Sequence, residues 1–332
     1  MPQIAVFVLG AACAALLTGG VRRYALARGV IDRPNARSLH ATPVPRGGGI
    51  AIVIVAGLVH AYVALSADAP RALGVWWWGA LVMAALGFLD DHRPLGMRLR
   101  LAIQLAVALA CVLATPWPPL VPPLEVLRAL VLAVGVAWLV NLYNFMDGSD
   151  GIAGTQAIVA AGVLGVLYTR GGCGAAGLVA AGLAGASLGF TWWNWAPARI
   201  FMGDAGSYYL GFQFASLGVG GAAQGCAPWP LLILISPFVT DATATLVRRM
   251  LAGEPWFRAH RCHAYQLLVR GGWPHGRVAT ALAVLCFTVS VPLACLAAAR
   301  PGLGPVATLI AYALAGTIWG AILRRGRALL RE

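Results

Sequence analysis

Apolar segments long enough to cross a lipid bilayer recur along the whole chain, and no long polar stretch separates them. A membrane-spanning helix needs about 20 mainly apolar residues. The pattern therefore predicts an all-α, polytopic integral membrane helix bundle of about eleven transmembrane helices in a single domain, 1–332. The predicted spans are 4–20, 47–66, 73–89, 99–116, 125–140, 152–169, 174–191, 206–222, 229–247, 278–298 and 303–322.

The composition agrees with this prediction. Of the 332 residues, 60% are hydrophobic and 11% are charged, whereas soluble domains carry about a quarter charged residues. The segment 4–20 could also be a signal peptide. No basic residue precedes it and no persuasive cleavage site follows it, so we interpret it as the first transmembrane helix.

The arginines predict the orientation in the membrane. All 24 basic residues are arginine, and 20 of them fall on the side of the first loop if eleven helices alternate in direction. The positive-inside rule makes that side cytoplasmic, with the N-terminus outside and the C-terminus inside. Nine of the eleven acidic residues fall on the same side, although acidic residues contribute little to orientation. We infer that the cytoplasmic face needs carboxylates for function.

The net charge of +13 does not require nucleic acid as a partner, because membrane topology and anionic phosphate ligands explain it. The seven cysteines are scattered, odd in number and without a CxxC pair. They predict neither a zinc site nor a disulfide framework.

Two groups of carboxylates stand at predicted helix ends. Asp90 and Asp91 are adjacent, which is tolerable if they are hydrated, paired with arginine or near a metal. An ordinary polar helix end paired with Arg93 or Arg98 is the simpler alternative. The second group is Asn141, Asn144, Asp147 and Asp150 in NLYNFMDGSDG, spaced by three. Oxygen-bearing side chains without a basic partner suit Mg²⁺, although turn and cap residues would look similar.

Three further segments add polar side chains on the cytoplasmic side. Asp204 stands between two glycines in FMGDAGSYYLG, as a helix N-cap or a metal ligand. FRAHRCHAYQ supplies Arg261 and His263, which suit anion or sugar recognition better than zinc. The first loop carries Arg37 and Arg46, which could bind phosphate or serve only as a topology signal.

Several function classes lose support. The chain has no GxxxxGK[ST] loop, no Rossmann glycine motif and no GxSxG elbow. No predicted span has a charged residue near its middle, where transporters and proton pumps usually place ionisable groups. A membrane transporter or lipid flippase with a cytoplasmic charged gate remains the alternative to an enzyme, and a non-catalytic scaffold is a third possibility.

Taken together, these segments resemble the polyprenyl-phosphate N-acetylhexosamine-1-phosphate transferases of glycosyltransferase family 4. The resemblance covers residues 30–277 and rests on DRPNARSLHATPVPRGGG, the Asp-Asp pair, NLYNFMDGSDG, FMGDAGS and DATATLVRR in this order. The segment HRCHAYQ replaces the clustered histidines of the peptidoglycan and enterobacterial branches. It is similar to the subgroup that initiates O-antigen or exopolysaccharide units, the former a part of lipopolysaccharide.

The resemblance implies a single transmembrane catalytic domain in the bacterial inner membrane, multi-pass, with its active site facing the cytoplasm. Its substrates would be a UDP-N-acetylhexosamine and undecaprenyl phosphate, with membrane lipids around the protein. The cofactor would be Mg²⁺ or, alternatively, Mn²⁺, and the protein could assemble as a homodimer. The sequence leaves open which UDP-sugar is used, which polymer is initiated, and whether the lipid phosphate attacks directly or through an aspartyl intermediate.

The resemblance also implies roles for individual residues. Asp204 and Asn144 would bind the metal, and Asp90 and Asp91 would orient or deprotonate the lipid phosphate. The remaining residues would shape the nucleotide pocket or contact phosphate or sugar: Asp147 and Asp150 as part of the catalytic set, and Arg37, Arg46, Asn141, Arg261 and His263 as substrate-binding residues.

Overall fold

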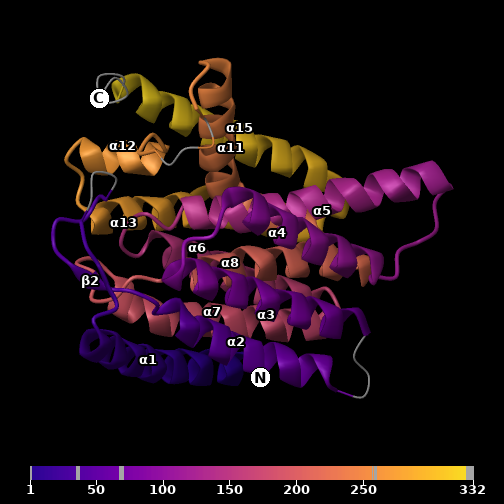
Figure 1. Cartoon of the computed structure of the whole chain (residues 1–332). Helices are drawn as coiled ribbons and strands as arrows, with labels where there is room; N and C mark the ends of the chain where they lie inside the picture. Colours follow the sequence, from indigo (N-terminus) through magenta and orange to yellow (C-terminus); the bar gives the residue numbers. More distant parts are fainter. Residues whose placement is uncertain (1, 35–37, 67–70, 256, 258–259, 327–332) are drawn as a thin grey trace.

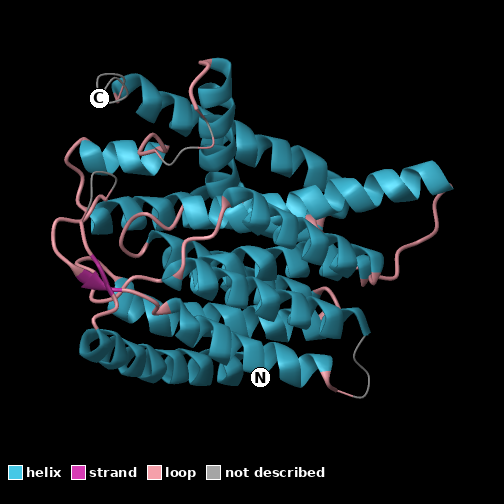
Figure 2. Cartoon of the chain, in the orientation of Figure 1, coloured by secondary structure: helices cyan, strands magenta, loops and turns pink. Residues whose placement is uncertain are grey.

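The computed structural model describes residues 2–34, 38–66, 71–255, 257 and 260–326. Within these ranges helices joined by loops make up nearly all of the structure (Figure 2), which confirms the all-α prediction. Two short antiparallel strands lie in the first loop, β1 (Ile31–Asp32) and β2 (Val44–Pro45), in the register Ile31 with Pro45.

The helices follow the predicted spans closely. In the first half of the chain they are α1 (Pro2–Arg28), α2 (Gly49–Ala64), α3 (Arg71–His92), α4 (Met97–Leu113), α5 (Pro122–Phe145), α6 (Ile152–Arg170) and α7 (Gly174–Asn194). In the second half they are α8 (Asp204–Ala215), η1 (Ser216–Gly220), α9 (Gly221–Ala223), α10 (Trp229–Leu234), α11 (Ser236–Leu251), α12 (Ala264–Arg270), α13 (His275–Leu285), η2 (Cys286–Ser290), α14 (Val291–Ala299), η3 (Pro301–Leu303) and α15 (Gly304–Arg325).

Seven helical segments in the described part of the chain are long and apolar enough to cross a membrane, which supports a multi-span membrane protein. They comprise α1, residues 72–92 of α3, α5, α6, α7, the continuous segment 275–299, and the segment 301–325. The number of eleven spans and the sides of the two termini stay predictions.

The predicted span 229–247 is divided in the structure. α10 ends at Leu234 and α11 begins at Ser236, with Pro237 in its first turn, where the missing N–H of proline is tolerated. Figure 1 shows α11 standing across the direction of the neighbouring helices, and α12 lies close to it at the same end of the bundle as β2. The turn after α10 therefore redirects the chain.

Two helices form the centre of the bundle. α7 packs against α1, α2 and α6, and α8 packs against α2, α3 and α5. From Ala205 to Ala215 every residue of α8 is buried. Gly87 of α3 lets the start of α8 come close, because a Cβ on Gly87 would lie 2.3 Å from the carbonyl oxygen of Asp204. This close contact brings Asp90 and Asp91 beside Asp204.

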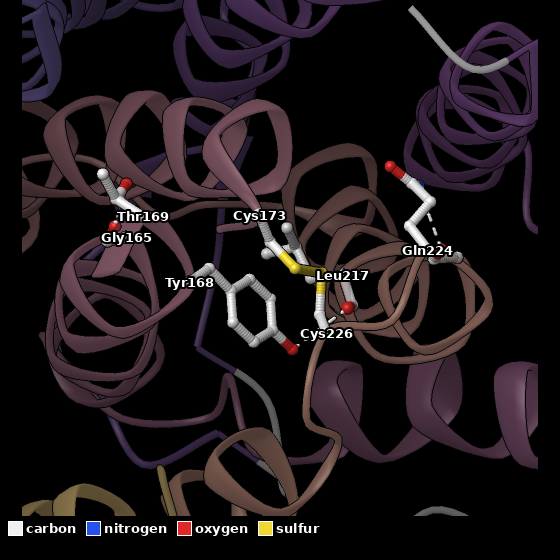
Figure 3. The surroundings of a disulfide bond; sticks show 8 residues. Gly165, Tyr168, Thr169, Cys173, Leu217, Gln224 and Cys226 are labelled. Carbon is white, nitrogen blue, oxygen red and sulfur yellow. Dashed lines mark hydrogen bonds between the residues drawn. A yellow bond between two sulfur atoms is a disulfide. The ribbon is translucent and has the colours of Figure 1, made fainter. Parts of the chain in front are cut away.

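One disulfide corrects the prediction from cysteine number. Cys173, between α6 and α7, is bonded to Cys226, after α9, with a Cα–Cα distance of 5.9 Å. Figure 3 shows the ring of Tyr168 beside this bond, its hydroxyl donating to the Leu217 carbonyl at 3.1 Å. The prediction failed because the two cysteines lie 53 residues apart in different loops, and only the fold brings them together.

Candidate active site

A polar cavity of about 380 Å³ lies at one end of the bundle, where the loops 30–49, 146–151 and 195–203 meet. Five residues singled out in the sequence line it: Arg46, Asn144, Asp147, Asp150 and Asp204. Asp32, Ser38, Leu39, His40, Gly148, Ser149, Asn194, Phe201, Met202, Gly203, Gln266 and His275 complete its wall. The structure thus brings together in one site side chains that stand up to 243 positions apart, as residues 32 and 275 do.

Asp204 and Asp91 share the guanidinium of Arg46. One nitrogen of Arg46 lies 3.0 Å from the Asp204 carboxylate and also forms an ion pair with Asp91. The Asp91 carboxylate accepts the backbone N–H groups of Asp204 at 2.9 Å and Ala205 at 3.3 Å. Asp204 is therefore the first residue of α8 rather than its cap, and Asp91 satisfies the free N–H groups of that helix end.

Asp90 points to a different set of partners. It accepts the Leu95 backbone N–H at 2.7 Å and the Tyr208 hydroxyl at 3.2 Å, and it forms an ion pair with Arg100. The polar-helix-end interpretation anticipated Arg93 or Arg98 as the partner, but the partner is Arg100, two residues after Arg98 on α4. The two adjacent carboxylates thus differ, since Asp91 faces the start of α8 and Asp90 is held by α4 and α8.

The regular spacing of the segment 141–151 is not carried by one helix, because α5 ends at Phe145. Asn144, in the last turn, donates from its amide nitrogen to Asp204 and to Ser207, both at 3.0 Å. Asn141 does not line the cavity; its amide nitrogen donates to the side chain of Gln104 and to the Ala137 carbonyl. Asp147 and Asp150 follow in the turn that leads into α6 and line the cavity from there.

His275 is a cavity residue that the sequence interpretation missed. Its Nδ1 lies 3.1 Å from the Ser149 hydroxyl, 3.2 Å from the backbone nitrogen of Asp150 and 3.4 Å from the Asp150 carboxylate. The other Asp150 oxygen accepts the backbone N–H of Ala198 at 2.9 Å. Asp150 thereby ties α13 and the loop after α7 to the cavity wall. No local pattern signals His275, because 125 residues separate it from Asp150.

The segment 260–266 approaches the cavity through α12. His263 is buried at the N-terminus of α12, with Nδ1 3.5 Å from Asp241, and the Arg261 carbonyl accepts a hydrogen bond from Arg270. Neither Arg261 nor His263 lines the cavity, whereas Gln266, from the same segment, does. The predicted roles of Arg261 and His263 in binding phosphate or sugar stay predictions.

Asp241 fixes this segment in place. Its carboxylate accepts the backbone N–H groups of Ala264 at 2.8 Å and Tyr265 at 3.1 Å, and the Thr245 hydroxyl at 3.2 Å. The Tyr265 hydroxyl in turn donates to the Phe145 carbonyl at 2.9 Å. It also occupies the space beside Gly148, where a Cβ would lie only 2.3 Å from it. α11 thus positions α12 against the loop that carries Asp147.

The cavity is electrostatically unbalanced. Burial, followed by the charge of Asp91, raises the pKa of Asp204 to about 6. Burial and the charge of Asp204 raise the pKa of Asp147 well above its usual value. Burial alone would lower the pKa of Arg46, but the carboxylates of Asp91 and Asp204 outweigh it and raise the pKa. One arginine does not offset this many carboxylates, so the site favours an additional cation.

The prediction that Arg37 binds substrate concerns a residue outside the described ranges.

The side chains around Asp204 fit Mg²⁺. Among the described residues, no group of three or more His, Cys, Asp or Glu side chains could hold a metal on its own. Mg²⁺ does not require one, because one or two carboxylates, waters and substrate phosphates commonly complete its shell. Asp204 and Asn144 line the cavity: Asp204 offers carboxylate oxygens, and rotation of the Asn144 amide, whose nitrogen faces Asp204, would offer an amide oxygen. The same donors suit Mn²⁺.

The chain is similar in sequence to known proteins. The model of the family described as "Glycosyl transferase family 4" matches residues 73–222. The chain is 30% identical to a decaprenyl-phosphate N-acetylglucosaminephosphotransferase from Mycobacterium tuberculosis, over 79% of this chain and 74% of the relative. The chain belongs to glycosyl transferase family 4. More precisely, it is a member of the polyprenyl-phosphate N-acetylhexosamine-1-phosphate transferases within that family.

Two further relatives show the breadth of this family. The chain is 28% identical to a probable undecaprenyl-phosphate N-acetylglucosaminyl 1-phosphate transferase from Bacillus subtilis, over 87% of this chain and 83% of the relative. It is 31% identical to a phospho-N-acetylmuramoyl-pentapeptide-transferase from Mycolicibacterium smegmatis, over 76% of this chain and 82% of the relative. Relatives whose names give different transferred groups therefore match this chain at similar sequence identity.

Proposed function

We propose that this family member transfers an N-acetylhexosamine-1-phosphate from a UDP-N-acetylhexosamine to undecaprenyl phosphate and releases UMP. The observation that carries the proposal is the cluster of Arg46, Asn144 and Asp204 at the wall of the polar cavity, with Asp91 paired to Arg46. The names of the relatives support the same general reaction.

The proposed chemistry is an attack of one phosphate on another. An oxygen of the lipid phosphate forms a bond to the sugar-bearing phosphorus of the donor. The bond from that phosphorus to the bridging oxygen breaks, and UMP leaves with the bridging oxygen. Both reactants are anions, so their approach is opposed by Coulomb repulsion. Bound Mg²⁺ would neutralise part of this charge and polarise the phosphoryl oxygens.

The side chains of the protein would supply positioning and the remaining positive charge. Arg46 lies between two carboxylates at the cavity wall, where a phosphate oxygen could compete for its guanidinium. Asp90, next to Asp91 in the chain, forms an ion pair with Arg100 and accepts the Tyr208 hydroxyl. Holding a lipid-borne and a water-borne substrate in one geometry is itself a large part of catalysis.

Two observations support a cytoplasmic active site in the bacterial inner membrane. The arginine distribution favours it through the positive-inside rule. The disulfide Cys173–Cys226 gives independent support, because α6 begins beside the cavity and ends at Arg170, just before Cys173. Its 19 residues separate the two ends by about 28 Å. Disulfides persist in oxidising compartments, so the cavity would face the opposite, reducing side.

The test of the reaction is UMP release by the purified full chain with undecaprenyl phosphate, Mg²⁺ and a panel of UDP-sugars. The panel contains the N-acetylglucosamine, N-acetylgalactosamine, N-acetylquinovosamine and N-acetylfucosamine derivatives. We expect UMP release with at least one donor and none without the lipid phosphate. No UMP with any donor from folded protein would reject the proposal and favour a transporter or flippase.

A matched variant separates catalysis from folding. Asp204→Asn keeps the size of the side chain and removes its charge, so UMP release should fall to background while the protein still elutes as a folded species. Unchanged UMP release would contradict the proposed metal site, and an unchanged phenotype in cells would favour a scaffold.

The sequence HRCHAYQ further leads us to propose that the product initiates an O-antigen or exopolysaccharide unit.

A further inference from the structure

A second cavity, of about 1070 Å³, opens on the side of the bundle between α1, α6, α7 and the segment of α13 and η2. Its lining is predominantly apolar. Its lining combines small residues with large aromatic rings, among them Ala12, Ala15, Gly189, Trp192, Trp195 and Phe287. This apolar groove is separate from the polar cavity, since the two share no lining residue.

The apolar groove spans one half of the bundle. At the end near the active site it is lined by Trp195, Pro197 and Arg199, which follow the last turn of α7. At its other end it is lined by Ala11 and Phe287, which lie near the middle of α1 and of the helical segment 275–299. From the start of α13 to Phe287 is about 18 Å of helix, close to the thickness of one bilayer leaflet, roughly 15 Å of hydrocarbon.

Two arginines stand beside the apolar groove: Arg199 lines it, and Arg22 contacts Arg199 without lining the groove. The Arg22 Nε donates to the Arg199 backbone carbonyl at 3.2 Å. The guanidinium carbon of Arg199 lies 4.4 Å from the centroid of the Trp193 ring, and that of Arg22 lies 5.9 Å from it. Neither arginine forms an ion pair with an acidic group anywhere in the described ranges. Two neighbouring positive charges without a counter-ion favour an anionic ligand.

We propose that the apolar groove binds one anionic glycerophospholipid, with its acyl chains along the groove and its phosphate beside Arg22 and Arg199. Basic sites between transmembrane helices bind anionic headgroups, and tryptophan prefers the boundary between headgroup and hydrocarbon. The apolar groove extends over about one leaflet. It therefore matches a lipid from the leaflet on the side of the active site and not an acyl chain that crosses the membrane. This inference does not depend on the proposed reaction.

The bound lipid would also support the active site. The loop 195–200 forms the mouth of the groove, and within it the Ala198 N–H donates to the Asp150 carboxylate at 2.9 Å. A lipid that orders this loop therefore holds one wall of the polar cavity in place. The apolar groove is therefore a separate binding site that is connected to the polar cavity through the loop 195–200.

Native mass spectrometry of the full chain in detergent tests the proposal, with phosphatidylglycerol and phosphatidylcholine of the same acyl chains as probes. We expect one phosphatidylglycerol to be retained at detergent concentrations that remove phosphatidylcholine. The double variant Arg22→Gln with Arg199→Gln should weaken retention roughly 30-fold, from about 1 kcal/mol per arginine. The variant Ala12→Phe, which fills the groove and leaves both arginines, should lose the lipid as well.

The control is Arg128→Gln. The guanidinium carbon of Arg128 lies 5.4 Å from the centroid of the Trp117 ring, so this arginine pairs with a tryptophan as Arg199 does but does not line the apolar groove. The Arg128→Gln variant should retain phosphatidylglycerol like the wild type. Equal retention of the two lipids by the wild type, or unchanged phosphatidylglycerol retention in the double variant, would overturn the proposal. A shift from dimer to monomer in Ala12→Phe without lipid loss would also overturn it, because a second copy would then cover the groove.

Discussion

Arg46 and Asp204 are 158 residues apart in the sequence, and the structure holds a guanidinium nitrogen of one 3.0 Å from a carboxylate oxygen of the other. The same guanidinium pairs with Asp91. This arrangement links the first loop, the end of α3 and the start of α8 at a single point. The carboxylates that would bind a divalent cation are therefore held by an arginine that could bind substrate phosphate.

The first prediction concerns Arg46. Arg46→Gln keeps an amide hydrogen-bond donor on a shorter side chain and loses the positive charge, so UMP release should fall about 10²-fold, as for other charge-stabilising donors. Arg46→Lys keeps the charge and loses the planar geometry, so it should be intermediate. The initial rate of UMP release at saturating substrates measures both. Equal activity of Arg46→Gln and wild type would show that the guanidinium only pairs with Asp91 and Asp204 in the substrate-free protein and does not contribute to catalysis.

The second prediction concerns pH and the metal-free protein. The pKa of Asp204 is raised from 3.8 to about 6, so the folded protein binds more protons than the unfolded chain between these values. Stability then decreases as the pH rises from about 4 to about 6. In EDTA, the wild-type melting temperature should be higher at pH 5 than at pH 7 by more than in Asp204→Asn. An identical pH dependence in the two proteins would contradict the raised pKa.

The third prediction concerns Asp241, a positioning residue. Asp241→Ala removes the acceptor for the first N–H groups of α12 and should cost about 1 kcal/mol. Because α12 carries Gln266 of the polar cavity, the KM for the UDP-sugar should rise several-fold, with a smaller effect on kcat. Asp241→Asn keeps one oxygen that can accept one of the two N–H groups, whereas its NH2 group cannot accept the other, so its KM should lie between those of the wild type and Asp241→Ala. A lower melting temperature with an unchanged KM in Asp241→Ala would indicate a purely structural cap.

The fourth prediction concerns the disulfide. Closing a loop of 53 residues should stabilise the fold by about 2–4 kcal/mol, so the double variant Cys173→Ser with Cys226→Ser should melt at a lower temperature. UMP release at 25 °C should be unchanged, because the bond lies at the end of α6 away from the polar cavity. A loss of activity in folded double variant would contradict this separation of the two ends.

The same bond gives a topology test. In a variant that lacks Cys13, Cys262 and Cys295, a membrane-impermeant maleimide should label Cys173 and Cys226 in intact cells only after reduction. A cysteine introduced by Arg199→Cys should be labelled only after the cells are permeabilised. The opposite result would place the active site outside and reverse the predicted orientation.

Sequence motifs singled out some of the residues that the structure brings together, and others were missed for an identifiable reason. Asp90, Asp91, Asn144 and Asp204 were recognisable because each stands in a short motif with other polar residues. His275 and Arg100 had no such signal, since each owes its place to a partner far away in the chain or on another helix. Asn141 shared the spacing of Asn144, but it lies one turn deeper on α5 and bonds to Gln104 instead.

The sequence by itself determined the all-α membrane fold, because burial of about 20 apolar residues in hydrocarbon forces the backbone to satisfy its own hydrogen bonds in helices. It also determined which residue types are available at the ends of those helices. Only the tertiary structure decided that Arg46 pairs with Asp91 and Asp204, that Cys173 meets Cys226, and that α11 turns across the bundle to hold α12. The physical reason is that hydropathy acts locally along the chain, whereas these pairings depend on which helix surfaces can approach each other closely enough, as Gly87 allows for α3 and α8.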